Sequence, residues 1–254
     1  MTYKKVNEIY YENIIPNQVI CNYNDDWLVT LGNYNKAYII NIQLSNIVFT
    51  FNTISKIYKT YDYDYIFFCD EQNYICSLEI KTNNIRKIIK VKTVPKTIYI
   101  SFDNKYLAFE EESFIKIINI QSNEIFYENN QYDLTIEKLL FTKKNVLFCL
   151  SFSKELISFI SSFNIQDNIF NSFGLDFMGA NDVLLIKDKY LVYCNFPDII
   201  RENFGELVIY DFKNKKDVFV EKVKDGYETL LFNQKYNLLL CTYNNYIDIF
   251  DILY

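Results

Sequence analysis

Apolar residues occur in this chain in short runs of about five residues, and a polar turn separates each run from the next. One kind of block recurs six times, as WLVTL, YIFFC, YLAFE, NVLFC, YLVYC and NLLLC. The blocks begin at positions 27, 65, 106, 145, 190 and 237. Recurrence at a period of about 40 residues indicates a repeat architecture, in which every copy is one structural unit.

Each block is the second of four predicted strands. An apolar run such as TIYISF (97–102) or ETLLF (228–232) precedes the block. A third strand such as IKIIN (115–119) and a fourth such as IFYEN (125–129) follow it. Short strands joined by short polar turns favour an antiparallel meander. The second strand is almost wholly apolar, which is typical of a strand buried on both faces. Radial stacking of four-stranded sheets provides that burial, so the pattern predicts a β-propeller.

Three segments of equal length resemble the core of WD40 repeats: WLVTLGNYNKAYIIN (27–41), YIFFCDEQNYICSLE (65–79) and NLLLCTYNNYIDIFD (237–251). Each ends with an apolar residue and Asp, Glu or Asn, where the family has its Trp-Asp pair. ISFDNKYLAF (100–109) resembles the family's first hairpin. The resemblance implies four-stranded blades and a ring in which the two ends of the chain share one blade. The chain has no histidine, so it lacks the family's Ser/Thr–His–Asp–Trp hydrogen-bond network.

The predicted fold is all-β: a six-bladed β-propeller of four-stranded antiparallel blades, forming one domain over residues 1–254. The sixth unit stops after its third strand, IDIFD (247–251). We expect YKKVNEIYYE (3–12) to pair with it and close the ring. The alternative is an open propeller that a partner's strand completes. The predicted blades are 17–52, 55–91, 96–129, 136–172, 181–222, and 227–254 together with 3–12.

Composition excludes several kinds of chemistry. The net charge is −6 and only two arginines occur, which disfavours direct nucleic-acid binding. The absence of histidine removes His-dependent nucleophiles and His-ligated zinc. No apolar run reaches the roughly 18 residues of a membrane span, and the N-terminus has no signal-peptide pattern. We expect a soluble, intracellular protein, cytoplasmic or nuclear, with its six cysteines as thiols. Because only five glycines occur, Asn and Asp must form many tight turns.

Two clusters have competing interpretations. Four cysteines occupy one repeat position in different units: Cys69, Cys149, Cys194 and Cys241. A metal or redox cluster is one interpretation, and a small buried apolar residue in each blade is the favoured one. The acidic run Glu110–Glu112 is interpreted as a solvated turn, with a site for a cation or a basic partner as the alternative.

Two segments depart from the repeat. NSFGLDFMGAND (171–182) runs between units four and five, and NFPDIIRENFGE (195–206) lies between the second and third strands of unit five. In a propeller both lie on one face, so we expect them to converge. Aromatic residues with an arginine on such loops favour a protein interface, and mutual packing of the loops is the alternative. The candidate partner-binding residues are Phe173, Phe177, Met178, Phe196, Asp198, Arg201, Glu202 and Phe204.

The predicted function is a non-enzymatic WD40-like scaffold or adaptor that contacts other proteins within a macromolecular complex. No catalytic residue, metal site or cofactor is expected, and membrane insertion is not expected either. One alternative is an RNA- or ribonucleoprotein-associated subunit whose tyrosines stack on bases. The other is a propeller hydrolase with carboxylates and metals at the central axis, which the lack of histidine disfavours.

Overall fold

The computed structural model describes residues 18–21, 27–32, 34–60, 64–112, 114–130, 134–153, 157–178, 180–195, 205–223, 227, 229–233, 236–243 and 246–252. Within these ranges the chain forms six antiparallel sheets, each a meander of strands that are consecutive in sequence. The first sheet contains β1 (Gln18–Cys21), β2 (Trp27–Leu31), β3 (Lys36–Asn41) and β4 (Asn46–Asn52). The second contains β5 (Tyr58–Lys59), β6 (Tyr65–Cys69), β7 (Tyr74–Glu79) and β8 (Asn84–Lys90). The third contains β9 (Ile98–Ile100), β10 (Tyr106–Glu111), β11 (Phe114–Asn119) and β12 (Ile125–Asn130).

The remaining sheets follow the same order. The fourth contains β13 (Leu134–Phe141), β14 (Val146–Ser153), β15 (Ile157–Asn164) and β16 (Ile169–Met178). The fifth contains β17 (Ala180–Ile186), β18 (Tyr190–Asn195), β19 (Gly205–Asp211) and β20 (Lys216–Val223). The sixth contains β21 (Thr229–Asn233), β22 (Leu238–Tyr243) and β23 (Tyr246–Asp251). The predicted all-β fold of repeated antiparallel sheets is confirmed.

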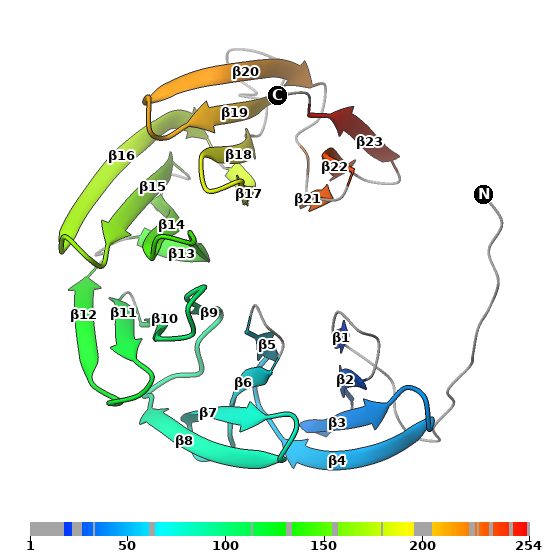
Figure 1. The fold of residues 1–254 in the computed structure, drawn as a ribbon. Coiled ribbons are helices and arrows are strands. Elements are labelled where there is room, and N and C mark those ends of the chain that lie inside the picture. Colours follow the sequence, from blue (N-terminus) through cyan, green and yellow to red (C-terminus); the bar gives the residue numbers. More distant parts are fainter. Residues whose placement is uncertain are drawn as a thin grey trace, which may run out of the picture.

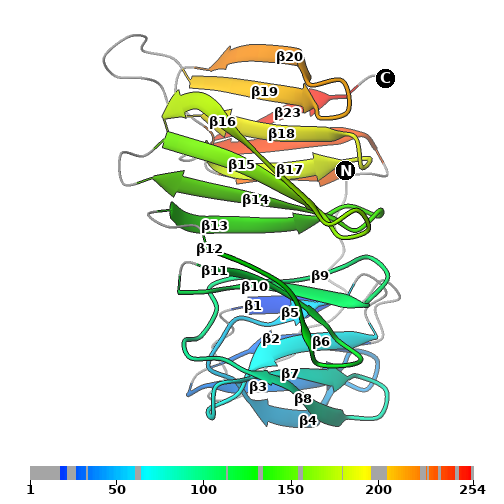
Figure 2. The ribbon, with the colours of Figure 1, turned by 90° about the vertical axis from the view of Figure 1, so that its left-hand side faces the viewer.

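The sheets follow one another around a central axis, with the first strand of each sheet innermost and the last outermost (Figure 1). Figure 2 shows the same arrangement from the side, with the hairpin turns gathered on two opposite faces. Because alternate turns lie on opposite faces, the turns after the first and third strands of a sheet share one face.

Consecutive sheets pack against each other through apolar side chains. Among the described residues, five buried clusters form, and each one joins neighbouring sheets in chain order. Strand β6 shows the principle. Its Ile66 and Phe68 belong to the cluster shared with the first sheet, while Phe67 and Cys69 belong to the cluster shared with the third. Since successive residues of a strand point to opposite faces, both faces of β6 are buried, as its uninterrupted apolar sequence predicted.

Asparagine forms many of the tight turns, as the scarcity of glycine predicted. Left-handed backbone conformation costs least for Asn after Gly. Within the described ranges, the asparagines with positive φ are Asn35, Asn73, Asn83, Asn104, Asn123, Asn145, Asn168 and Asn237.

The prediction of a connecting loop at 171–182 is wrong. Most of this segment is strand β16, and only residue 179 separates it from β17. The reason lies in the length of β15, whose backbone offers partners from Asn164 back to Ile157. The pairing passes from Phe159↔Gly174 to Ile157↔Met178, so the additional residues are accommodated in a register shift within the strand.

The solvated turn predicted at Glu110–Glu112 is also wrong for Glu111, which is the last residue of β10 and is buried. Its carboxylate lies 2.7 Å from the Lys116 ammonium and accepts a hydrogen bond from the backbone N–H of Lys92, which precedes the third sheet. Burial acts to raise the pKa of Glu111, but the bonds from Lys116 and Lys92 outweigh burial and lower it. Glu111 therefore holds the connection between the second and third sheets.

The sixth sheet ends at β23, where the described part of the chain provides no fourth strand. Tyr227, which is buried, fixes this sheet to the fifth. Its backbone N–H donates to the Cys194 Sγ at 3.2 Å, and its hydroxyl donates to the Asp248 Oδ2 at 2.6 Å. The expected closing segment, 3–12, lies outside the described residues.

Replacing Tyr227 by Phe is expected to lower the free energy of unfolding by about 1–2 kcal/mol, because the Asp248 carboxylate loses its donor in a half-buried site. Urea denaturation measures this change. The control is Tyr34→Phe, at a side chain that is 90% exposed and should leave stability unchanged. Equal effects of the two substitutions would contradict the role given to Tyr227.

Candidate functional site

The innermost strands enclose a central cavity of about 760 Å³. Its lining residues come from the first strand of each of the six sheets, or lie directly beside that strand. Most are apolar, including Ile20, Ile57, Ile98, Ile100, Leu140, Phe141, Leu184, Leu185 and Phe232. A mostly apolar hollow with a few polar groups is the usual form of a ligand or peptide site.

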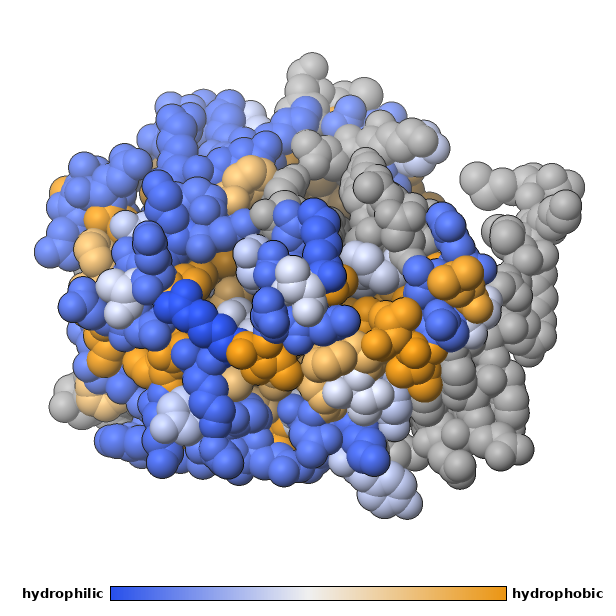
Figure 3. Space-filling model, turned by 60° about the horizontal axis from the view of Figure 1, so that its bottom comes forward, coloured by the Kyte–Doolittle hydropathy of each residue, from blue (hydrophilic) through white to orange (hydrophobic). Residues whose placement is uncertain are grey.

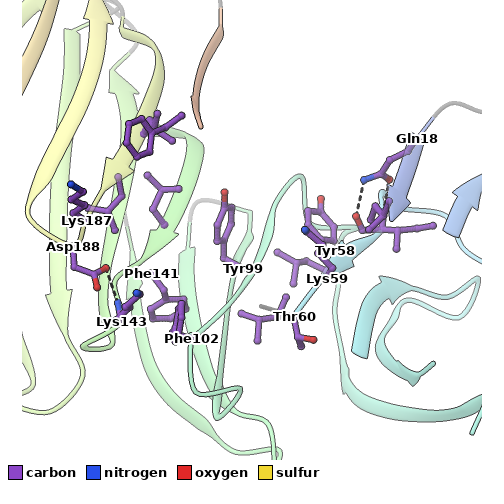
Figure 4. Close-up of a pocket in the computed structure, with 18 residues that line it drawn as sticks. Gln18, Tyr58, Lys59, Thr60, Tyr99, Phe102, Phe141, Lys143, Lys187 and Asp188 are labelled. Atoms are coloured by element: carbon purple, nitrogen blue, oxygen red, sulfur yellow. Dashed lines mark hydrogen bonds between the residues drawn. The ribbon is translucent and has the colours of Figure 1, made fainter. Parts of the chain in front are cut away.

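Two tyrosines point into this cavity (Figure 4). The Tyr58 hydroxyl donates to the backbone carbonyl oxygen of Lys96 at 2.7 Å. Burial, and then the neighbouring Tyr99, raise the pKa of Tyr58 to about 12. Burial, and then the Asp182 carboxylate, raise the pKa of Tyr99 to about 12. Both phenols therefore stay protonated at neutral pH, so they can donate hydrogen bonds but cannot serve as phenolate nucleophiles.

Asp182 connects three sheets at one end of the innermost strands. Its carboxylate bonds to the Lys138 ammonium of β13 and accepts a hydrogen bond from the Leu230 N–H of β21 at 2.9 Å. The Asp182 side chain itself belongs to β17 and is only 13% exposed. Sequence reasoning missed this bridge because Asp182 is the last residue of an apparent loop. The one feature of the sequence that could have indicated the bridge is the acidic residue Asp182 directly before the apolar run of an innermost strand.

At the opposite end, the turns after the innermost strands bind one another. Asn145 Nδ2 donates to Asp103 Oδ2 at 2.9 Å, which joins the third and fourth sheets. The Lys143 backbone N–H donates to Asp188 Oδ1 at 2.9 Å, which joins the fourth and fifth. Figure 4 shows Lys143, Lys187 and Asp188 together on one side of the cavity. These two bonds therefore join the third, fourth and fifth sheets at this mouth of the cavity.

Arg86 has a structural role between the second and third sheets. Its Nη2 lies within 3.1 Å of the carbonyl oxygens of Ile120 and Gln121 and the side-chain oxygen of Asn123. These acceptors belong to the turn between β11 and β12, beside a smaller cavity of about 470 Å³. Since its guanidinium is occupied by that turn, Arg86 holds two sheets together and is not a candidate anion site.

The predicted interface residues are only partly placed. The backbones of Phe173, Phe177 and Met178 lie in outer strand β16. The structure pairs Ala180 with Asn195, so the end of β16 and the start of the β18–β19 connection lie close together. The other candidates lie outside the described residues: Phe196, Asp198, Arg201, Glu202 and Phe204.

The cysteines behave as buried apolar residues. Cys69, Cys149, Cys194 and Cys241 are each at most 2% exposed, and all are free thiols. Burial raises their pKa values to about 11 or 12. In the part of the chain that the structure describes, no group of three or more His, Cys, Asp or Glu side chains could hold a metal ion. The buried-residue interpretation is confirmed.

The outer rim carries exposed apolar residues in several sheets. Figure 3 brings the β4 and β8 edge of Figure 1 forward and shows apolar side chains in a band between polar regions. Exposed examples are Ile47 and Val48 of β4, Ile85 of β8 and Val220 of β20. Because outer strands of different sheets share this feature, it does not distinguish one binding site.

No protein-family model and no curated protein matches the sequence. Solved structures do match the fold. The β-propeller domain of Cps50 (Swd1) from Myceliophteria thermophila is 12% identical and matches with a TM-score of 0.66, over 92% of this chain and 82% of that one. A chain of the mitotic checkpoint complex is 8% identical and matches with a TM-score of 0.69, over 96% of this chain and 76% of that one. Hydrazine synthase from Kuenenia stuttgartiensis is 13% identical and matches with a TM-score of 0.68, over 94% of this chain and 77% of that one.

At these identities the likeness defines the fold alone, and that fold is a β-propeller. The described residues contain no helix with the length and apolarity that crossing a membrane requires. The arrangement offers six sheets around an apolar central cavity, with polar turns on two opposite faces.

The Asp103 bridge should make stability depend on pH. Burial acts to raise its pKa, but hydrogen bonds from Asn145, Ser101 and the Lys105 N–H outweigh burial and lower it. A carboxyl group with a lowered pKa stabilises the fold at pH values above its ordinary pKa of about 4. This stabilisation disappears as the pH falls through the lowered pKa of the folded state. Asp103→Asn should therefore be less stable than wild type at pH 7, by less than about 1 kcal/mol. The difference should shrink towards pH 2 in thermal denaturation. A difference that does not change with pH would contradict this assignment.

Proposed function

We propose that this protein is a non-enzymatic propeller scaffold that docks other proteins within an intracellular assembly. The observation that carries the proposal is the meeting of β16 and the β18–β19 connection, through the paired residues Ala180 and Asn195. The two segments leave the rigid strands at neighbouring positions on one face. Loops and strand ends held on a rigid scaffold are common sites of recognition.

The composition of this surface supports docking. The residues that we propose for it are Phe173, Phe177, Met178, Phe196, Asp198, Arg201, Glu202 and Phe204. Aromatic residues, Met and Arg are enriched in protein interfaces. A chain of similar fold occurs in the mitotic checkpoint complex, which is a multi-protein assembly by its name.

The proposal includes a ring of six blades closed by the chain itself. Leu230, Leu239 and Cys241 face the fifth sheet, so Leu231 and the cross-strand neighbours Leu240 and Ile249 face the other way. Leu231 is 56% exposed and Ile249 is 61% exposed. An apolar sheet face of this kind favours a covering partner, which we propose is the first sheet. Residues 3–12 would then add a fourth strand beside β23.

Replacing Phe177, Arg201 and Phe204 by Ala should weaken partner binding at least about tenfold, while the free energy of unfolding changes by less than about 0.5 kcal/mol. Affinity purification of wild type and variant from the native organism, with quantitative identification of co-purifying chains, measures the first effect. Thermal denaturation measures the second.

The matched control replaces three exposed apolar residues of other outer strands by Ala: Ile47, Phe126 and Val220. This control should retain the partners. If the control loses them equally, or if the first variant loses several kcal/mol of stability, the surface does not function as proposed.

Deleting residues 1–12 should lower the free energy of unfolding by on the order of 3 kcal/mol, because a strand's apolar burial contributes about 25 cal/mol per Å². Self-closure also predicts a crosslink. A cysteine at Ile247 should form an intrachain disulfide with a cysteine scanned through Lys5, Asn7, Ile9 and Tyr11. The control, Val220→Cys with the same partners, should form none. An unchanged stability together with no Ile247 crosslink would indicate an open ring that a partner strand completes.

A further inference from the structure

Four turns lie on one face of the fourth and fifth sheets, and three of them are rich in lysine. They cover 142–145, 165–168, 187–189 and 211–217, including the strand ends. They hold seven lysines against four aspartates, in a chain whose net charge is −6. We call the seven the basic turn surface: Lys143, Lys144, Lys187, Lys189, Lys213, Lys215 and Lys216. The β17–β18 and β19–β20 turns lie on the same side of the ring in Figure 2.

Two of the four aspartates bind backbone N–H groups of these turns, and Asp211 also forms an ion pair with Lys189 at 3.4 Å. Asp188 accepts a hydrogen bond from the Lys143 N–H at 2.9 Å. Asp211 accepts from the backbone N–H groups of Lys213 and Asn214, both at 3.0 Å. The turns are thereby held in one conformation, and six of the seven lysine side chains are exposed. Lysines fixed on rigid turns present positive charge without an ordering cost for the backbone.

This surface borders the mouth of the central cavity. Lys143 and Lys187 line the cavity together with Phe102 and Phe141 (Figure 4). The Lys143 ammonium lies 5.1 Å from the centre of the Phe102 ring. A ligand at this mouth therefore meets positive charge on the rim and an apolar hollow of about 760 Å³ behind it.

We propose that the basic turn surface binds an acidic peptide segment of a partner protein. Carboxylates of the segment face the lysines, and one apolar side chain enters the cavity between Phe102 and Phe141. A peptide fits better than a nucleic acid for two reasons. The surface contains lysine and no arginine, so it lacks the bidentate forks that bind phosphate, and the acidic remainder of the chain repels a long polyanion.

The site goes beyond the scaffold function proposed above and does not depend on it. Strand β18 begins at the β17–β18 turn and ends at Asn195, so the two surfaces lie at opposite ends of the strand. The protein would hold one partner on each face of the ring.

The test uses a fluorescein-labelled twelve-residue peptide of Asp and Glu with a central Phe, and its Asn and Gln counterpart. Fluorescence anisotropy should detect binding of the acidic peptide alone, weakening as salt rises. The variant Lys143→Glu, Lys187→Glu, Lys215→Glu should bind at least about tenfold more weakly. The milder variant Lys143→Gln, Lys187→Gln, Lys215→Gln should bind the acidic peptide with an affinity between those of wild type and the Glu variant. Its melting temperature should be unchanged.

The control variant reverses the same amount of charge at exposed lysines of the first two sheets: Lys36→Glu, Lys56→Glu, Lys90→Glu. It should keep its affinity within about twofold. The variant Phe177→Ala, Arg201→Ala, Phe204→Ala should also keep it, which separates this site from the loop surface. The proposal is overturned if wild type does not bind the acidic peptide, if the control loses as much affinity as the variant, or if oligothymidylate of equal charge binds more tightly.

Discussion

The packing of one sheet face against the next is the interaction on which the rest of this structure depends. A four-stranded meander has two faces, and a strand as apolar as β6 or β18 is stable only when both are covered. In β18, Leu191 and Tyr193 pack towards the fourth sheet, while Val192 and Cys194 pack towards the sixth. The second to fifth sheets each separate two apolar cores, so consecutive sheets share the burial that no single sheet achieves.

This sharing also determines where polar side chains can lie. The interior of each stack has room for few polar groups, so ion pairs and hydrogen bonds between sheets concentrate at the strand ends. Asp182 and Lys138 occupy one end of the innermost strands, and Asp103, Asn145 and Asp188 occupy the other. The apolar packing joins sheets that are consecutive in the chain, and these bonds join the same sheets at their strand ends. At both ends of the cavity, polar bonds of this kind join neighbouring sheets between the third and the sixth.

Much of the strand pattern could be predicted from the sequence, because local alternation and polar turns encode it. The apolar blocks at 65–69 and 27–31 coincide with β6 and β2. The long-range polar contacts could not be predicted. Asp182 lies 44 residues from Lys138 and 48 from Leu230, so no local pattern indicates those bonds. The part of β16 beyond residue 172 was not predicted as a strand, because its pairing depends on the length of β15 and serines interrupt the apolar pattern within 157–164. The cavity depends on all six innermost strands together and is invisible in any one of them.

The simple meander of each sheet has a consequence for synthesis. Because every strand pairs with its neighbour in sequence, a sheet can form as soon as its own residues leave the ribosome. A newly formed sheet then exposes one apolar face until the following sheet arrives to cover it. The growing chain therefore exposes an apolar sheet face at its newest end, and chaperones bind such surfaces. Among the described residues, the sixth sheet still exposes such a face, at Leu231 and Ile249.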